Sequence, residues 1–245
     1  MSSIYESEKL LAEYLLFHYG TADEILPPGY IWPEGMITAL DFPVRTVGHF
    51  KQPRVARGLD LGCAVGRSSF EMTRFCDEVT GIDFSHAFIR TAEALRSGET
   101  LDYARLEEGN LLTRLAARMP EGLAVDNLHF KQGDAMNLPE DIGPFDRVHA
   151  ANLLCRLSEP EKLLVRLPGL VKPGGELVLA TPCSWLEEFT PIKNWPACST
   201  IEWLKESLEN NFSLVTQTEE PFLIRETARK FQWSRSLVTV WQRIS

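Results

Sequence analysis

The sequence has few of the features that mark nucleic-acid-binding, secreted or membrane proteins. Acidic residues outnumber basic ones by 34 to 25, giving a formal net charge of −9, and no long cluster of Lys and Arg offers a surface for phosphate groups. Glu6, Glu8 and Glu13 interrupt the apolar residues of the N-terminus, which argues against a secretory signal. No stretch approaches the ~20 apolar residues that span a bilayer. We therefore expect a cytoplasmic protein that binds neither nucleic acid nor membrane.

Cysteine is also scarce, and its spacing argues against two common uses. The five cysteines are Cys63, Cys76, Cys155, Cys183 and Cys198. They are odd in number and widely spaced, and no two form a C-x-x-C pair, so the pattern indicates neither a disulfide framework nor a zinc site. We expect free thiols and no metal.

The remaining sequence alternates short apolar runs with helix-compatible segments, which predicts an α/β fold around a parallel sheet. Expected strands cover residues 55–61, 78–82, 128–132, 145–151 and 176–181, with a last pair at 212–218 and 236–241. Expected helices cover residues 4–19, opened by a capping box of Ser3 and Glu6, and 68–75, 163–170 and 200–211. At 245 residues, of which 44% are hydrophobic, the chain fits one large domain over 1–245.

Three segments depart from this alternation. Residues 20–44 are rich in proline and glycine and predict an ordered, lid-like loop, which completes an N-terminal part over 1–50. Residues 98–126 are expected to be an insertion into the core of 51–245, with a strand near 101–107 and a short helix near 112–118. A second insertion is expected at 221–235, because this segment is longer than a simple hairpin turn.

Small residues follow the first expected strand and precede the first core helix. The acid Asp60 comes two residues before Gly62, and Cys63, Ala64 and Val65 separate that glycine from Gly66. A dinucleotide loop would follow G-x-G-x-x-G, which fits poorly. The pattern instead resembles an S-adenosylmethionine loop, D-x-G-x-G-x-G, with Ala64 at the middle glycine. Position 64 is therefore expected not to need a positive φ.

Further polar residues follow the next strands, at the edge of a parallel sheet where ligands bind. Asp83 ends the second strand and can accept hydrogen bonds from a ribose diol. Phe84 can flank an adenine or belong to the core. Asp134 and Ala135 follow the third strand, where a carboxylate can accept from an adenine amino group or simply close a turn. Asn152 follows the fourth strand and is a candidate site residue.

Candidates for contact with a second ligand are spread along the chain. Tyr14, His18 and Tyr19 add polar tips to an otherwise apolar helix face, which can equally be plain packing. Arg45 can meet a carboxylate or form a surface salt bridge. The acidic and aromatic loop holding Trp185, Glu187 and Glu188 suits an amphipathic organic substrate. Arg225 and Arg229 would share one face of a helix and can clamp a carboxylate or be solvated.

The loop, together with Asp83 and Gly133-Asp134-Ala135, resembles the class I S-adenosylmethionine-dependent methyltransferases. The resemblance implies a Rossmann-like fold: a seven-stranded, mostly parallel sheet with an antiparallel last strand and helices on both faces. It also implies S-adenosylmethionine as co-substrate. The implied cofactor-binding residues are Asp60, Gly62, Cys63, Ala64, Gly66, Arg67, Asp83, Phe84, Asp134, Ala135 and Asn152.

Segments 14–20, 42–45, 151–156, 185–188 and 222–233 resemble a narrower group, the methyltransferase module of ovothiol biosynthesis. That module is often the C-terminal part of 5-histidylcysteine sulfoxide synthase and methylates the π nitrogen of 5-thiohistidine. The resemblance implies the same reaction here, with a separate synthase and a lyase as partners that supply the substrate. Candidate residues for orienting the ring or binding the amino-acid end are Tyr14, Arg45, Asn152, Trp185, Glu187, Glu188, Arg225 and Arg229. No general base is assigned.

Three other functions remain open from the sequence. The chain can be a methyltransferase for another small amino acid or imidazole. It can be a non-catalytic adenosyl-binding partner of a sulfoxide synthase. It can also be a nicotinamide oxidoreductase, because an acid at position 83 suits either adenosyl cofactor.

Overall fold

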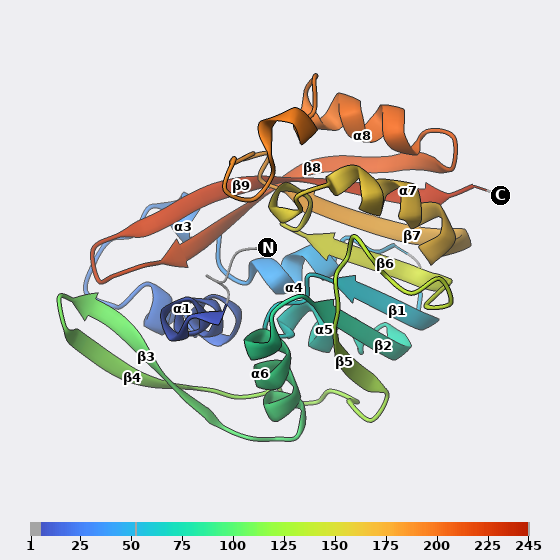
Figure 1. Ribbon diagram of the computed structural model, residues 1–245. Coiled ribbons are helices and arrows are strands. Elements are labelled where there is room, and N and C mark those ends of the chain that lie inside the picture. Colours follow the sequence, from blue (N-terminus) through green and yellow to red (C-terminus); the bar gives the residue numbers. More distant parts are fainter. Residues whose placement is uncertain (1–5, 52, 245) are drawn as a thin grey trace.

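The structure is a computed structural model that describes residues 6–51 and 53–244. A seven-stranded sheet lies at the centre of this part of the chain. From edge to edge the strands are β5 (Leu128–Gln132), β2 (Cys76–Asp83), β1 (Val55–Leu61), β6 (Phe145–Ala151), β7 (Val171–Thr181), β9 (Phe231–Arg243) and β8 (Phe212–Arg225) (Figure 1). The first five are mutually parallel, and β9 runs antiparallel to both its neighbours. The predicted Rossmann-like fold with an antiparallel last strand is confirmed.

The order of the strands reverses at β1, which lies between β2 and β6. The connections leaving β1 and β6 therefore diverge to opposite faces and open a crevice at the carboxyl ends of these strands. Side chains alternate along β1, with Leu59 and Leu61 packed on one face and Asp60 directed to the other. The core thus places an acidic side chain directly before the crevice.

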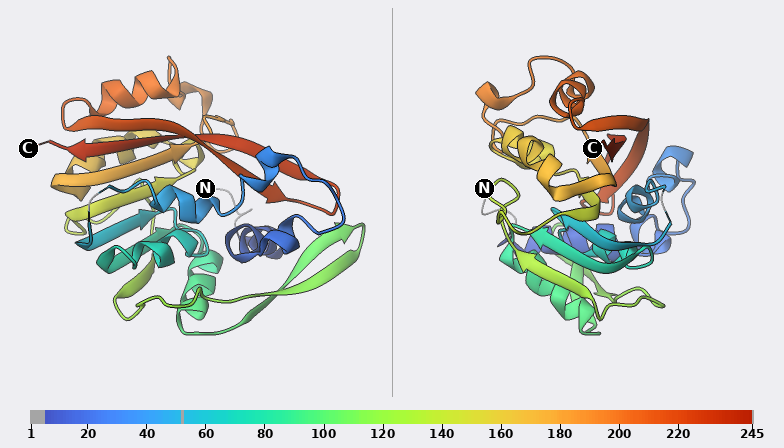
Figure 2. Two further views of the ribbon diagram at one scale, coloured as in Figure 1. Left: turned by 180° about the vertical axis from the view of Figure 1, so that it is seen from behind. Right: turned by 90° about the vertical axis from the view of Figure 1, so that its right-hand side faces the viewer.

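Helices cover both faces of the sheet, as expected (Figure 2). One face carries α5 (Arg67–Met72) and α6 (His86–Arg96), and the other carries α7 (Pro160–Leu170) and α8 (Thr200–Leu208). The apolar side chains of α7 recur at helical spacing in Leu163, Leu164, Leu167 and Leu170, all buried. Burying each contributes about 1.5–3 kcal/mol, so packing rather than helix propensity stabilises this layer. Two short 3₁₀ helices, η2 (Leu154–Arg156) and η3 (Ile192–Asn194), lie in the connections.

The N-terminal part is more helical than expected. The first helix, α1, covers Glu8–Tyr19 and begins where the Ser7 hydroxyl accepts a hydrogen bond from the backbone of Leu10, 3.3 Å away. The helix starts later than predicted, and Ser3 of the proposed capping box lies outside the described residues. The stretch 20–44 is not an irregular loop, because it forms α2 (Ala22–Ile25), α3 (Glu34–Ile37) and the start of α4 (Phe42–Val47). Its prolines sit between or at the first turns of these helices, where no backbone N–H is needed.

Residues 98–126 contain a hairpin of β3 (Leu101–Glu108) and β4 (Leu111–Ala117). The strand near 101–107 is confirmed, whereas the helix expected near 112–118 is wrong. Here cross-strand pairing decides the conformation: Leu112 lies opposite Leu106, and Ala116 opposite Asp102. Both strands contact α1 and burial alternates along β4, so packing outweighs the weak helical propensity of the segment.

The segment 221–235 is also strand rather than helix. The strands β8 and β9 continue through it as one long hairpin and are joined at the tip, where the backbone of Glu226 donates to the Lys230 carbonyl at 2.9 Å. Arg225 and Arg229 therefore share no helical face. This hairpin and β3–β4 extend to the same side of the molecule, with α1 packed against both (Figure 1).

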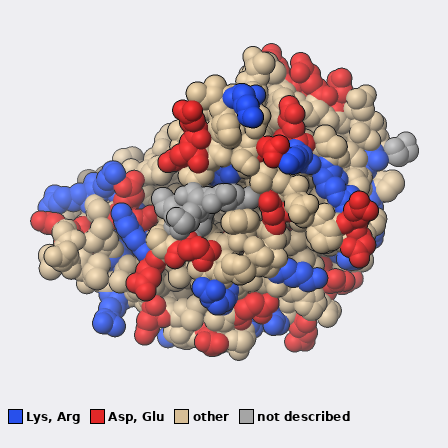
Figure 3. Space-filling view, viewed as in Figure 1, with Lys and Arg blue, Asp and Glu red and all other residues tan. Residues whose placement is uncertain are grey.

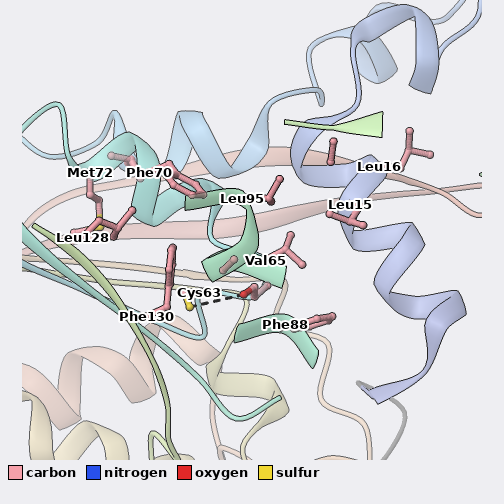
Figure 4. Close-up of a cluster of buried hydrophobic side chains, with 14 of the residues drawn as sticks. Leu15, Leu16, Cys63, Val65, Phe70, Met72, Phe88, Leu95, Leu128 and Phe130 are labelled. Atoms are coloured by element: carbon pink, nitrogen blue, oxygen red, sulfur yellow. Dashed lines mark hydrogen bonds between the residues drawn. The ribbon is translucent and has the colours of Figure 1, made fainter. Parts of the chain in front are cut away.

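The loop after β1 is held in a buried apolar cluster, drawn in Figure 4. Its residues Cys63 and Val65 lie among side chains from α1 (Leu15), α5 (Phe70) and α6 (Leu95). The loop is thus fixed by three helices before any ligand is considered.

On the face drawn in Figure 3, Lys and Arg side chains are interspersed with Asp and Glu side chains. Among the described helices, not one combines the length and the apolar character needed to cross a membrane.

Candidate functional site

A cavity of ≈ 410 Å³ lies at the carboxyl ends of β1, β2, β6 and β7. Its walls come from the β1–α5 loop, from α1 and from the β8–β9 hairpin, so segments from both halves of the sequence enclose it. Of the predicted site residues, those that line it are Tyr14, His18, Asp60, Gly62, Cys63, Ala64, Asp83, Phe84, Ala135, Asn152 and Glu188. Eight of these come from the predicted cofactor set, which the fold brings together around one space.

Three residues of the β1–α5 loop have a left-handed backbone: Gly62 (φ 70°), Ala64 (φ 48°) and Gly66 (φ 90°). A Cβ at Gly66 would lie 2.7 Å from the Phe130 ring, so this position also requires close approach. The expectation that position 64 avoids a positive φ is wrong. A left-handed alanine costs roughly 1–2 kcal/mol, and the backbone N–H of Ala64 donates to Asp83 at 2.9 Å in that conformation.

Two further contacts support this loop. The Tyr19 hydroxyl donates to the carbonyl of Val65 at 2.6 Å, and burial holds the pKa of that hydroxyl well above its usual value, so Tyr19 stays a donor. Within the loop, the backbone of Gly66 donates to the Cys63 carbonyl at 2.8 Å. Tyr19 therefore lies behind the loop and supports it, rather than lining the cavity.

Asp83 lies at the end of β2 with its carboxylate at the cavity. One oxygen accepts from the backbone of Ala64 and the other from that of Ser85, both at 2.9 Å. Burial raises its pKa to about 6, although these two hydrogen bonds oppose the shift. Each oxygen keeps a lone pair for a further donor. Phe84, 41% exposed, lines the cavity beside it.

Beyond β5, Gly133 and Ala135 line the cavity. The Asp134 carboxylate instead accepts from the backbone of Met136 at 2.9 Å, which closes the turn. Arg67 lies outside the lining and forms an ion pair with Glu71. Asp134, Arg67 and Gly66 are thus outside the residues that line the cavity.

Asn152 follows β6 with a left-handed backbone (φ 54°). The side-chain oxygen of Asn152 accepts from the hydroxyl of Ser236 on β9 at 2.6 Å, and its backbone N–H donates to the Ala180 carbonyl at 2.8 Å. Because the oxygen is engaged, the two N–H groups of the amide are the donors that Asn152 can offer to a ligand.

Beneath the loop, Asp60 and His149 form a buried pair that also lines the cavity. His149 Nδ1 lies 2.8 Å from one Asp60 oxygen, and the Ser69 hydroxyl donates to the other at 2.6 Å. The sequence analysis missed His149. The available signal was its place in an apolar strand, between Val148 and Ala150, where a buried histidine needs a partner.

The part of the cavity lined by α1, α6 and the β8–β9 hairpin, its aromatic and acidic end, combines aromatic and acidic side chains. The Tyr14 ring lies 4.8 Å from that of Phe88 and 5.8 Å from that of His18. Burial and the nearby Arg67 lower the pKa of His18 to about 3, so this imidazole is neutral. Glu13 and Glu226 face this end as well.

Burial raises the pKa of Glu13, and the neighbouring Glu226 adds to the shift by repulsion. Other lining residues that sequence reasoning missed are Phe17, Phe42, Arg156, Phe189, Phe222, Gln232 and Ser234. Most lie on α1 and the β8–β9 hairpin, and their convergence depends on the packing of these distant segments.

Five other candidates lie outside the lining residues: Arg45, Trp185, Glu187, Arg225 and Arg229. Arg45 donates to Glu220 at 2.9 Å, and His49 contacts the same carboxylate at 2.8 Å. Arg225 is buried against Glu107, at 2.7 Å. Arg229 is exposed near the hairpin tip, and Glu187 is also exposed.

Trp185 is directed toward α8. Its ring nitrogen donates to Thr200 at 3.2 Å, and its ring packs edge-on against Trp203, with the centroids 5.7 Å apart. Trp185 therefore anchors, against α8, the loop in which Glu188 lines the cavity.

A family of proteins described as a methyltransferase domain matches residues 39–219, well over half of the sequence. The chain belongs to this methyltransferase family. The match covers the β1–α5 loop, Asp83, Asp134 and Asn152, and it stops within β8. The aromatic and acidic end of the cavity, built by α1 and the hairpin tip, lies largely outside it.

Curated relatives of this methyltransferase include two O-methyltransferases. A ubiquinone biosynthesis O-methyltransferase of Xanthomonas axonopodis pv. citri is 29% identical over 174 residues, 67% of this chain and 62% of that protein. The O-methyltransferase cnsE of Penicillium expansum is 28% identical over 183 residues, 71% of this chain and 58% of that protein. The chain spans about three fifths of the length of these relatives.

Solved methyltransferase structures share the fold. N-methyltransferase NodS of Bradyrhizobium japonicum WM9, in complex with S-adenosyl-L-homocysteine, superposes with a TM-score of 0.56 at 13% identity. The superposition covers 96% of this chain and 99% of that one. A likeness at this identity extends to the fold.

The residues of this methyltransferase fit S-adenosylmethionine. The glycine at position 66 is needed for a close-packed loop, and Asp83 offers free lone pairs suited to ribose hydroxyls. Five of the described lining residues are acidic: Glu13, Asp60, Asp83, Glu188 and Glu226. Arg156 is the only Lys or Arg among the described lining residues. This excess of carboxylates favours a ligand with cationic sulfonium and ammonium groups.

Proposed function

We propose that the chain is an S-adenosylmethionine-dependent N-methyltransferase that methylates the π nitrogen of 5-thiohistidine to give ovothiol. One observation carries the proposal: a single cavity joins the cofactor loop to an end that is both aromatic and acidic. A planar, zwitterionic acceptor matches such a surface, because rings stack on aromatic walls and carboxylates bind ammonium groups. The resemblance of segments 14–20, 151–156 and 222–233 to the ovothiol module supports the particular acceptor.

S-adenosylmethionine supplies an electrophilic methyl group on its sulfonium. The residues of the chain hold donor and acceptor in line, and such alignment contributes several kcal/mol, on the order of 7 at best. We assign the ribose to Asp83 and the adenine surroundings to Phe84 and Ala135. No side chain is required as a general base when the acceptor nitrogen already presents its lone pair.

The acceptor ring needs one nitrogen engaged and the other free. The amide of Asn152 is suited to this, since Ser236 fixes its oxygen and leaves its N–H groups to donate. Tyr14 offers a ring face beside Phe88. A hydrogen-bond donor that engages the other ring nitrogen or the thiolate leaves the π nitrogen free to attack the methyl group.

For the amino-acid end, Glu13 and Glu226 are suited to the ammonium and Arg156 to the carboxylate, although Glu226 also pairs with Lys230 at 2.6 Å. Arg45 and Arg225 are engaged by Glu220 and Glu107, so their use as clamps would require those pairs to open. A sulfoxide synthase followed by a carbon–sulfur lyase is the class of reactions that would supply the thiohistidine.

The test is turnover of 5-thiohistidine with S-adenosylmethionine, with histidine and a catechol as parallel acceptors. We expect S-adenosylhomocysteine release with 5-thiohistidine, and NMR of the product should place the methyl group on the π nitrogen. Faster turnover of another imidazole or amino acid would replace the proposed acceptor. Tight cofactor binding without turnover of any acceptor would favour a non-catalytic binding role.

A matched pair of variants tests the acidic end. Glu226→Gln, which removes a charge that lines the cavity, should raise the KM for 5-thiohistidine about tenfold, the loss of one charge-assisted hydrogen bond. Glu219→Gln removes an exposed charge on the preceding strand, β8, and should leave KM unchanged. Equal behaviour of the two variants would argue against ammonium binding at Glu226.

A further inference from the structure

The hydrogen-bond chain of Ser69, Asp60 and His149 has an end that no group of the described residues fills. Asp60 and His149 are 1% and 0% exposed, and both line the cavity. Asp60 accepts from Ser69 and from His149 Nδ1, at 2.6 and 2.8 Å. His149 Nε2 is buried and has no hydrogen-bond partner among the described residues. Leaving a buried imidazole nitrogen without a partner is unfavourable, so this nitrogen points to a ligand.

The chemistry of that ligand follows from the proton arrangement. An ionised carboxylate can only accept, so the Nδ1 that contacts Asp60 carries the hydrogen. When the ring carries a single proton, Nε2 therefore holds its lone pair, on the side of the ring away from Asp60. With a carboxylate directly behind the ring, this lone pair suits a cationic donor and disfavours an anion.

The position of the pair identifies which part of the cofactor it would meet. Asp60 and His149 lie opposite each other on the adjacent strands β1 and β6. Asp83 and Ala135 follow β2 and β5, on the other side of β1, and that side is assigned to the adenosine. His149 is three residues deeper in β6 than Asn152, so it lies beneath the loop and not beside the hairpin that lines the acceptor end. We therefore assign the remaining part of the cofactor, its amino-acid end, to the position of Asp60 and His149.

We propose that His149 Nε2 accepts a hydrogen bond from the α-ammonium group of S-adenosylmethionine, while Asp60 and Ser69 fix the tautomer and orientation of the ring. The inference rests on the proposed function for the identity of the cofactor and is independent of the acceptor. It makes His149 a cofactor-binding residue specific for the amino-acid moiety.

The experiment compares two ligands that differ in that moiety. S-adenosylhomocysteine carries the ammonium, whereas 5′-methylthioadenosine lacks the whole amino-acid group. In His149→Asn, the shorter amide can still donate to Asp60 but offers no acceptor at the Nε2 position. By calorimetry, the variant should bind S-adenosylhomocysteine about tenfold more weakly, the cost of a hydrogen bond to a charged group, and 5′-methylthioadenosine within about twofold of the wild-type protein. His129→Asn, an exposed histidine on β5, serves as control and should change neither.

Equal weakening of both ligands in His149→Asn would show a structural role and overturn the inference, as would unchanged binding of both. Absence of S-adenosylhomocysteine binding by the wild-type protein would instead overturn the proposed function. If the variant does not fold, ¹⁵N NMR of the wild-type histidine rings replaces it. The Nε2 resonance of His149 should shift with S-adenosylhomocysteine and not with 5′-methylthioadenosine. The same shift with both ligands, or none with either, would reject the contact.

Discussion

Two residues of the cofactor end hold unfavourable states in the folded protein. Ala64 has a left-handed backbone, and Asp83 is a buried carboxyl with a raised pKa. The two are joined by the hydrogen bond from the Ala64 N–H to Asp83. Such strain and desolvation persist where contacts with the rest of the folded protein hold the residue in place. The sequence identified both residues from their motif, but it gave no sign of the strained backbone at Ala64, since φ depends on the contacts of the folded loop.

Replacing Ala64 by glycine should stabilise the protein. The left-handed conformation costs an alanine roughly 1–2 kcal/mol, and glycine loses about 0.5–1 kcal/mol of that gain through its greater freedom when unfolded. We expect the free energy of unfolding in urea to rise by about 0.5–1 kcal/mol. The control, Ala94→Gly within α6, should lower it by about 1 kcal/mol. A loss of stability in Ala64→Gly would contradict the strain at this position.

The affinity for S-adenosylhomocysteine should fall in mild acid. With a pKa of about 6, Asp83 becomes protonated as the pH drops from 7.5 to 5, and the dissociation constant should rise about tenfold if the ionised form binds the ribose. Calorimetry across this range measures the effect, and Asp83→Asn should bind weakly with a flat profile. A flat profile in the wild-type protein would remove the ionised carboxylate from the contact.

The same group has the opposite effect on the unliganded fold. Because its pKa is raised from 3.8 to about 6, the folded state holds this proton more tightly than the unfolded chain. Its contribution to stability is therefore present below about pH 4 and is lost as the pH rises through about 6.

At the scale of elements, strands were easier to predict than the segments that complete the site. Core strands such as β1, β5 and β6 lie where their apolar patterns indicated, with identical bounds. The helix expected near 112–118 and the insertion at 221–235 were instead two hairpins, stabilised by pairing and by contact with α1. Those contacts join residues far apart in the sequence, so local pattern carried little information about them.

The two hairpins are linked by Arg225. Its guanidinium donates to Glu107 at 2.7 Å and to the backbone carbonyls of Glu24 and Ile25 at 3.2 and 3.1 Å. Replacing Arg225 by Met should lower the free energy of unfolding by about 2–3 kcal/mol, less than for a fully buried pair because Glu107 is part-exposed. The control Arg229→Met, at an exposed side chain, should change the free energy of unfolding by less than about 0.5 kcal/mol.

Kinetics distinguish this structural role from substrate binding. If Arg225 instead clamps a substrate carboxylate, its variant should raise KM with little loss of stability. A large rise in KM without a change in urea midpoint would therefore reject the role of Arg225 as a link between hairpins.

For the whole molecule, ligand binding should be visible as thermal stabilisation. A ligand at 100 times its dissociation constant adds about 2.7 kcal/mol, which for a chain of this size corresponds to a rise in Tm of roughly 5–10 °C. We expect S-adenosylhomocysteine to give this shift in differential scanning fluorimetry and NAD to give none. A shift with NAD alone would favour the oxidoreductase alternative.

The cavity draws its walls from Leu10 at one end of the sequence to Ser234 near the other. During synthesis on a ribosome, the cofactor loop therefore emerges long before the strand that supplies Ser234 and Ser236. A nascent chain can form the half of the site around Asp83 but lacks the support that β9 gives Asn152. Cofactor can protect the enclosed site only after β9 has left the ribosome, so the proteolytic sensitivity of shorter nascent chains should not depend on it.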